Sequence, residues 1–99
     1  MSGADSPEGA AFGRRSCLIG NKLGLHARAA AKFVRMAGSY DAEVWVVRNG
    51  TRVSGVSILG LMMLAAAPGS EIIVEARGAQ TSEVLEALVN LVDDNFDED

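Results

Sequence analysis

The sequence predicts an α+β domain: a two-layer, open-faced sandwich in which three helices cover one face of a four-stranded sheet. Strand and helix signals alternate along the chain in the order βαββαβα. The helices are too few and too short to cover both faces of the sheet, so they should share one face. A chain of 99 residues, 48% of them hydrophobic, suits one domain that builds its core without metal or disulfide support.

The chain divides into a leader, one domain and a tail. Residues 1–13 are rich in small and polar residues without apolar periodicity, and we expect a disordered leader there. Residues 14–92 form the domain, and residues 93–99 form an acidic tail that holds five of the 13 acidic residues. The rest of the chain has nine basic and eight acidic residues, so the net charge of −4 describes the tail more than the domain.

Local signals set the expected element boundaries. The dipeptide Asn49-Gly50 is favoured in type I′ hairpin turns, so the segments on its two sides should pair as antiparallel strands. Ser57 is a good N-cap for a helix that Pro68-Gly69 ends. In chain order we expect a strand over 16–20, a helix over 27–37, strands over 43–48 and 51–53, a helix over 57–67, a strand over 72–76 and a helix that starts near Ser82.

His26 is the only histidine in the sequence and the strongest candidate for chemistry. It follows Gly24-Leu25 and precedes an amphipathic helix, where unpaired backbone N–H groups and the helix dipole favour a bound anion such as phosphate. The positive helix end also disfavours the imidazolium, which keeps a ring nitrogen nucleophilic near neutral pH. Arg28 can reach the same phosphoryl oxygens through charge-assisted hydrogen bonds. A lone histidine is more often an ordinary surface or core residue than a reactive one, and Arg28 alone would be a solvated helix charge. The prediction of a phosphoryl-accepting site therefore depends on both residues lying at the same helix start.

The helix expected over 57–67 is apolar on all sides, so core packing accounts for only part of it. Either it is a buried helix with a few exposed side chains, or it presents a protein-docking patch. Met62 and Met63 suit a surface that meets several partners, because their side chains repack easily.

Composition argues against several other classes of protein. One histidine and one cysteine, Cys17, do not supply a metal site, and no cofactor is expected. Trp45 is the only aromatic residue in the expected strands, which argues against an RNA-binding sheet. No apolar stretch approaches the ~20 residues of a membrane span, and no paired acid and base indicates small-molecule catalysis. The single cysteine and the lack of a signal segment indicate the cytoplasm.

Two separated motifs resemble one family. The segment Gly24-Leu25-His26-Ala27-Arg28, followed by an alanine-rich helix with Phe33-Val34, resembles the active-site segment of HPr, the histidine phosphocarrier of the bacterial phosphoenolpyruvate-dependent phosphotransferase system. The segment Ser57-Ile58-Leu59-Gly60-Leu61-Met62 resembles the family's regulatory serine helix, and Gly69 with Glu71-Ile72 continues the match. The resemblance covers roughly residues 16–91 and implies an antiparallel sheet of order 1-4-2-3.

The resemblance implies a phosphocarrier that works between protein partners rather than a stand-alone enzyme. His26 would accept a phosphoryl group at Nδ1 from enzyme I and donate it to enzyme IIA proteins. The backbone N–H groups of Ala27 and Arg28 would hold the phosphoryl group, and an HPr kinase/phosphorylase would modify Ser57 to regulate docking. The protein would act as a monomer and bind neither nucleic acid nor membrane.

The resemblance also favours the docking alternative for the second helix. An apolar centre with a basic rim around the histidine would attract acidic or phosphorylated partners. The implied docking residues are Ile58, Leu59 and Met62 for the apolar centre and Arg28, Lys32 and Arg35 for the basic rim.

The sequence departs from the family pattern at one position near the site. The family usually has proline after the arginine, whereas this chain has Ala29, which is also an excellent helix former. This difference favours the nitrogen-related branch of the phosphotransferase system over the sugar-transport branch. The alternative function is a regulatory HPr-like module that controls partner enzymes or transcription without carrying phosphate; such a module should lack the histidine.

Overall fold

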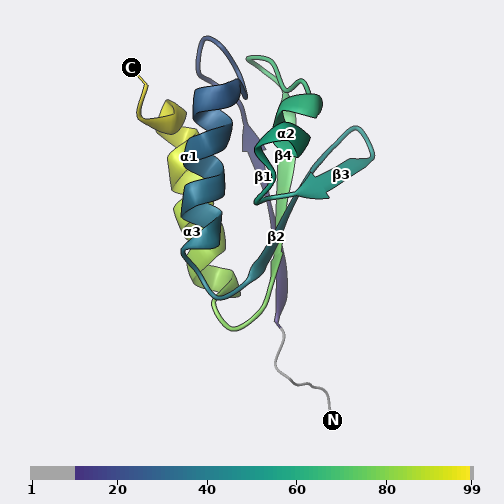
Figure 1. The fold of residues 1–99 in the computed structure, drawn as a ribbon, viewed down its shortest axis with the longest axis vertical. Coiled ribbons are helices and arrows are strands. Elements are labelled where there is room, and N and C mark those ends of the chain that lie inside the picture. The colour runs from purple at the N-terminus through teal and green to yellow at the C-terminus, as the bar shows by residue number, and fades with distance from the viewer. Residues whose placement is uncertain (1–10, 99) are drawn as a thin grey trace.

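The structure, a computed structural model, describes residues 11–98 as one antiparallel sheet with helices packed on it. The sheet order is β1-β4-β2-β3, and α1 and α3 lie side by side on one face, with α2 against α1 and β3 (Figure 1). The predicted α+β class and the 1-4-2-3 order are therefore confirmed. In chain order the elements are β1 (Phe12–Leu18), α1 (Ala27–Gly38), β2 (Glu43–Arg48), β3 (Thr51–Ser54), α2 (Ile58–Met63), β4 (Glu71–Arg77), α3 (Thr81–Asp93) and the 3₁₀ turn η1 (Asn95–Asp97).

The hydrophobic core lies between the sheet and the helices. Phe33 of α1 and Leu88 of α3 are completely buried, as are Ile72 and Val74 of β4. Alternate residues of β4 face this core, as expected of a strand in a sheet that is covered on one side.

Cys17 lies in β1 with its side chain in the core. Burial, with a smaller contribution from Asp93, raises the pKa of its thiol from the usual 9.0 to about 11. Because folding raises this pKa, the stability contribution of the neutral thiol is present at pH values below 9.0. It is lost as the pH rises through about 11. At neutral pH the thiol is therefore protonated and shielded from reagents.

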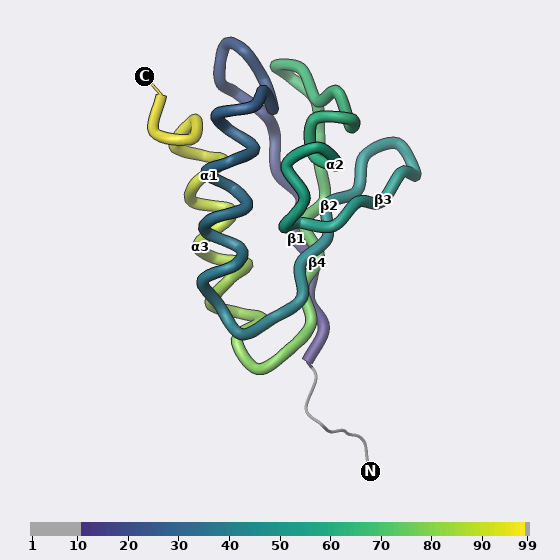
Figure 2. Tube along the Cα trace, viewed as in Figure 1, coloured from purple at the N-terminus to yellow at the C-terminus, as the bar shows by residue number. Residues whose placement is uncertain are grey.

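The predicted hairpin at Asn49-Gly50 is confirmed. Asn49 and Gly50 have φ angles of 50° and 81°, so both are left-handed, as a type I′ turn requires. The turn joins β2 to β3, which pair antiparallel beginning at Arg48 and Thr51. Figure 2 shows this hairpin on the side of the molecule opposite α1 and α3.

β1 begins earlier than the sequence predicted, so Phe12 and Gly13 of the expected leader lie in the sheet and pair with β4. A Cβ at Gly13 would lie 2.7 Å from Cδ1 of Leu85, so the glycine lets α3 pack directly on the strand. Glycine weakens a strand signal, which is why composition favoured disorder here. Residues 1–10 of the expected leader lie outside the described residues.

α2 is shorter than expected and ends at Met63 instead of near residue 67. Ala65 has a left-handed backbone with φ of 53°, and the Ala66 carbonyl accepts a hydrogen bond from the Leu25 N–H at 2.9 Å. The chain after α2 therefore leaves the helix and supports the loop before α1. The sequence did not indicate this because alanines are among the best helix formers.

The segment expected to be an acidic tail is packed onto the domain. α3 continues to Asp93, and Phe96 in η1 is completely buried. Lys32 of α1 donates a hydrogen bond from Nζ to the Phe96 carbonyl at 2.7 Å. One apolar residue in an acidic run gives no periodicity, so composition alone indicated a free tail.

Candidate functional site

His26 is the N-cap of α1, at the helix N-terminus expected from the sequence. Its backbone is extended, with φ of −80° and ψ of −180°, and its carbonyl accepts the first helical hydrogen bond from the Ala30 N–H at 2.8 Å. Its ring turns back over the helix end, where Nδ1 accepts a hydrogen bond from the Arg28 backbone N–H at 3.3 Å. Nδ1 therefore faces the unpaired N–H groups and the positive end of the helix dipole.

The loop before His26 is held by contacts from two other parts of the chain. Gly24 has φ of 68°, and a Cβ there would lie 2.4 Å from the Ala66 carbonyl oxygen, so only glycine fits. The Gly24 carbonyl accepts hydrogen bonds from Asn21 Nδ2 at 2.8 Å and from the His26 N–H at 2.9 Å. Asn21 and the segment after α2 therefore set where the histidine lies.

The other ring nitrogen of His26 contacts a residue that no sequence pattern indicated. Nε2 lies 2.6 Å from Oε2 of Glu98, the residue that follows η1. Oε1 of Glu98 accepts a hydrogen bond from Asn21 Nδ2 at 3.1 Å. His26 and Glu98 are 72 positions apart, so only the tertiary fold brings them together.

These contacts change the pKa of the Glu98 carboxyl. Although desolvation alone would raise its pKa, the hydrogen bonds from Asn21 and His26 and the charges of His26 and Lys32 lower it below the usual 4.5. Because folding lowers this pKa, the ionised carboxylate stabilises the fold at pH values above 4.5. This contribution is lost as the pH falls through the lowered pKa that the carboxyl has in the folded protein. Near neutral pH Glu98 is thus an ionised acceptor for an N–H at Nε2.

Ala27 and Arg28 are exposed in the first turn of α1, beside Nδ1. Within residues 11–98 the Arg28 guanidinium forms no hydrogen bond or ion pair, whereas its backbone N–H is used by Nδ1. The His26 side chain is 25% exposed, so a phosphoryl donor can reach the ring.

The three residues of the expected basic rim are spread along α1. Lys32 is half-buried, and its ammonium group donates to the Phe96 carbonyl. Arg35 lies in the last turn of α1, at the other end of the helix from His26. Arg28 lies in the first turn of α1 beside His26, and the charge of Lys32 acts on the Glu98 carboxyl that contacts the His26 ring.

Most apolar side chains of α2 are exposed, as a docking patch requires, whereas Leu61 is buried in the core. Ile58 and Met62 are each 41% exposed, and Leu59 is 69% exposed. Leu23, in the loop before α1, is 72% exposed and lines one shallow hollow with His26. Leu23 is therefore a further candidate docking residue. The sequence did not indicate it, because a single apolar residue in a loop forms no pattern.

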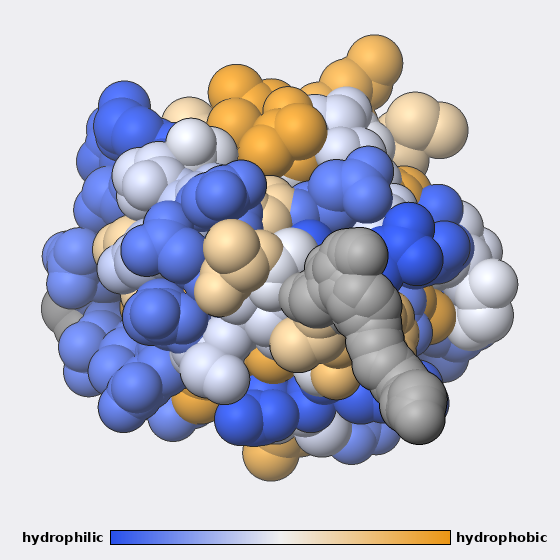
Figure 3. Space-filling model, turned by 90° about the horizontal axis from the view of Figure 1, so that it is seen from below, coloured by the Kyte–Doolittle hydropathy of each residue, from blue (hydrophilic) through white to orange (hydrophobic). Residues whose placement is uncertain are grey.

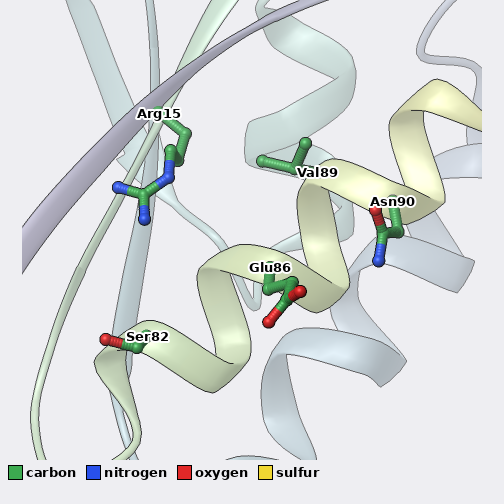
Figure 4. Close-up of a pocket in the computed structure, with 5 residues that line it drawn as sticks. All are labelled: Arg15, Ser82, Glu86, Val89 and Asn90. Carbon is green, nitrogen blue, oxygen red and sulfur yellow. The ribbon is translucent and has the colours of Figure 1, made fainter.

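Two further hollows are lined by residues other than His26. One of them is lined by two predicted rim residues, Lys32 and Arg35, together with Met36, Ser39, Leu91 and Asp97. A hollow between β1 and α3 is lined by Arg15, Ser82, Glu86, Val89 and Asn90 (Figure 4). Figure 3 shows the end of the molecule opposite the start of α1, where hydrophilic residues cover much of the surface and hydrophobic ones gather along one edge. The hollow beside Leu23 and Ala66 is lined by His26, the predicted phosphoryl acceptor, so the region around His26 is the candidate site.

Ser57 is the N-cap of α2, as predicted. Its Oγ accepts a hydrogen bond from the Gly60 N–H at 2.9 Å, and its side chain is half-buried. The hydroxyl therefore has a structural role that is independent of any modification.

Known proteins are similar to this chain in sequence and in fold. A family model described as the PTS HPr component phosphorylation site matches residues 14–94. The phosphocarrier protein HPr of Neisseria meningitidis serogroup B is 51% identical over 85 residues, which cover 86% of this chain and 96% of the relative. The phosphocarrier protein NPr of Escherichia coli K12 is 46% identical over 83 residues, or 82% and 91% of the two chains. The crystal structure of HPr-C-His from Thermoanaerobacter tengcongensis has a TM-score of 0.84 at 36% identity and covers 88% of this chain and 98% of that chain.

The fold and the site together define a small carrier domain that presents a histidine at a helix N-terminus. The match over residues 14–94 and the similar relatives show that the chain belongs to the HPr family. It is a phosphocarrier of the phosphotransferase system, and its partners are proteins of that system. Among residues 11–98, no helix is long and apolar enough to cross a membrane, and no group of three or more His, Cys, Asp or Glu could hold a metal ion.

Proposed function

We propose that His26 carries the phosphoryl group, accepting it at Nδ1 from phosphorylated enzyme I and passing it to enzyme IIA proteins. The orientation of the ring is the observation that supports this proposal most, because Nδ1 faces the N-terminus of α1. A phosphoryl group on Nδ1 would meet the helix end that favours negative charge. The N–H groups of Ala27 and Arg28 would donate hydrogen bonds to its oxygens.

Transfer needs little covalent chemistry from the protein. The Nδ1 lone pair forms the new bond to phosphorus, and the bond to the donor atom breaks with its electron pair going to the donor. The helix N-terminus and Arg28 offset the charge on the three phosphoryl oxygens during this exchange. Onward transfer to an enzyme IIA protein repeats the step with His26 as the donor.

Incubation with phosphoenolpyruvate and enzyme I tests this function. The mass of the protein should rise by one phosphoryl group, and acid should remove it, because a phosphohistidine hydrolyses in acid whereas a serine ester does not. No gain in mass, or an acid-stable gain, would instead support the regulatory module that does not carry phosphate.

The Arg28→Ala variant should receive phosphoryl groups from enzyme I roughly tenfold more slowly or worse, because it loses charge-assisted hydrogen bonds to the moving group. Its free energy of unfolding should change by less than about 0.5 kcal/mol, because Arg28 is exposed and its guanidinium forms no bond within residues 11–98. Rapid-quench kinetics and urea denaturation measure the two effects.

Arg35→Ala is the matched control for Arg28, because it removes the same charge from the far end of α1. It should slow transfer much less. Equal slowing by the two substitutions would mean that Arg28 acts through general attraction of acidic partners rather than on the phosphoryl group.

We also propose that Ile58, Leu59 and Met62 form the docking surface for both partners, and that an HPr kinase/phosphorylase modifies Ser57 beside it. The exposed apolar side chains of α2 support this surface. A phosphate on Ser57 would add about −1.5 to −2 charges next to the surface and so oppose docking.

The Ser57→Asp variant should stay folded but accept phosphoryl groups several-fold more slowly. Aspartate caps a helix about as well as serine and adds a negative charge to the docking surface. Ser57→Asn, which caps without charge, should transfer at nearly the wild-type rate, and Ser57→Ala should lose ~1 kcal/mol of stability with little loss of transfer. Wild-type kinetics for the aspartate variant at low salt would leave Ser57 as a cap only.

We assign the carrier to the cytoplasm as a monomer, and to the nitrogen-related branch on the basis of Ala29. Ala29 is completely buried in the first turn of α1, so the helix forms without proline there. The single cysteine is free and buried, which fits a reducing compartment.

The presence of His26 favours the carrier function over a purely regulatory module.

A further inference from the structure

The contact between Glu98 and His26 is the feature of the site that phosphoryl binding does not explain. Oε2 of Glu98 lies 2.6 Å from Nε2, on the ring nitrogen that is not expected to bond phosphorus. The two side chains are 19% and 25% exposed, so the contact is largely shielded from solvent. A short contact between a carboxylate and an imidazole nitrogen is a charge-assisted hydrogen bond when the nitrogen carries a proton.

The fold holds Glu98 in place from two sides. Asn21, which is 3% exposed, donates from Nδ2 to Oε1 of Glu98 and to the Gly24 carbonyl, so the loop that positions His26 also positions its partner. Phe96 is completely buried, and Lys32 donates to its carbonyl. Glu98 is therefore attached to a packed segment, not to a free tail.

The backbone before Glu98 takes an uncommon path to reach the ring. Asn95, Phe96 and Asp97 have φ angles of 56°, 56° and 61°, three successive left-handed residues. Such residues cost free energy unless surrounding contacts compensate, and they concentrate at functional sites. Here the burial of Phe96 compensates, and the result of the turn is that the Glu98 carboxylate faces His26.

We propose that Glu98 is a positioning residue for phosphoryl transfer, which keeps the proton on Nε2 of His26 while Nδ1 accepts and then releases the phosphoryl group. The proposal rests on His26 being the phosphorylated residue. In a histidine ring, the hydrogen bond made by one nitrogen decides whether the other nitrogen carries a proton or a free lone pair. A carboxylate at Nε2 therefore leaves the lone pair on Nδ1, and it orients the ring as an aspartate orients the histidine of a serine protease.

The retained proton balances both steps of the transfer. When Nδ1 attacks, its lone pair forms the nitrogen–phosphorus bond, the donor atom leaves with the old bonding pair, and the ring becomes a phospho-imidazolium with its proton still on Nε2. When the phosphoryl group leaves, the bonding pair returns to Nδ1 and the ring leaves as neutral imidazole. Without that proton the ring would have to leave as an imidazolate, which is a far poorer leaving group. The Glu98 carboxylate stabilises the positive ring between the two steps.

Hydrolysis of the phosphorylated protein tests this role without any partner protein. Wild type, Glu98→Gln and Asp97→Asn are each phosphorylated with the small donor phosphoramidate, and loss of the phosphoryl group to water is followed by mass from pH 5 to pH 10. Glutamine keeps the shape and an acceptor oxygen but removes the charge. Asp97→Asn is the matched control, because it removes the same charge from the neighbouring exposed residue. Lys32 of α1, whose charge also acts on the Glu98 carboxylate, is the same in all three proteins.

The phosphorylated Glu98→Gln variant should hydrolyse roughly 3- to 10-fold more slowly than wild type at pH 8, because its ring loses the Nε2 proton at lower pH. Its whole rate–pH curve should shift to lower pH, while the curve of Asp97→Asn should overlay that of wild type. A merely structural role would not move this curve in a variant that stays folded. In ¹⁵N spectra, the phosphorylated wild type should keep the proton on Nε2 to higher pH than the glutamine variant.

Superimposable rate–pH curves for wild type and Glu98→Gln would overturn the proposal. An equal shift in Asp97→Asn would also overturn it, because general charge would then explain the effect. If neither phosphoramidate nor phosphoenolpyruvate with enzyme I places an acid-labile group on wild-type His26, the proposed function fails and the role of Glu98 fails with it. Phosphorylation of His26 with unshifted curves would refute only the role of Glu98.

Discussion

The His26→Ala variant is expected to take up no phosphoryl group from phosphorylated enzyme I under conditions in which the wild type takes up one. Alanine removes both ring nitrogens, so no atom remains at the start of α1 to form the bond to phosphorus. The substitution also removes the N-cap, which costs about 1 kcal/mol. Mass spectrometry of the intact protein measures uptake, and circular dichroism checks the fold.

His26→Asn is the control that separates chemistry from structure. Asparagine is among the best N-cap residues, so this variant should keep most of the stability that alanine loses. It has no nucleophilic ring and should also take up nothing. An acid-labile phosphoryl group on either variant would contradict the assignment of His26.

The Gly24→Ala variant should lose about 3 kcal/mol of stability and transfer phosphoryl groups more slowly. The added Cβ would lie 2.4 Å from the Ala66 carbonyl oxygen, and φ is 68°, so the backbone must move. That movement would displace the His26 N–H, which donates to the Gly24 carbonyl. Urea denaturation measures the loss of stability.

Gly50→Ala provides the matched control for Gly24. Gly50 also has a left-handed backbone, with φ of 81°, but a Cβ there has nothing within 4 Å. This variant should lose only about 1 kcal/mol and transfer normally. Similar losses for the two variants would show that backbone strain, and not the contact with Ala66, decides the cost at Gly24.

The parts of the fold that the sequence predicts best are those with local signals. Asn49-Gly50 and the amphipathic pattern of α1 depend on neighbouring residues, and both elements form where expected. The starts and ends of β1 and α2 depend on tertiary contacts instead. Gly13 is in a strand because α3 packs on it, and the chain leaves α2 early because Ala66 bonds to Leu25.

The same distinction applies to the site. The position of His26 at the start of α1 follows from the adjacent sequence, and so does the capping role of Ser57. Glu98 reaches His26 only because Phe96 anchors the segment after α3, and no periodicity indicates a contact between residues 72 positions apart. The predicted basic rim extends along α1, so Arg28 lies in its first turn and Arg35 in its last turn. That Lys32 and Arg35 contact partner proteins stays a prediction.

Location of the phosphoryl group on the ring tests the central claim most directly. Protein labelled with ¹⁵N-histidine is phosphorylated with phosphoenolpyruvate and enzyme I, and the nitrogen bonded to phosphorus is identified by its ¹⁵N–³¹P coupling. We expect the coupling at Nδ1 of His26, together with shifts of the Ala27 and Arg28 amide signals as their N–H groups bind the phosphoryl oxygens. Coupling at Nε2, or a phosphorus signal without coupling to nitrogen, would contradict the account of the site.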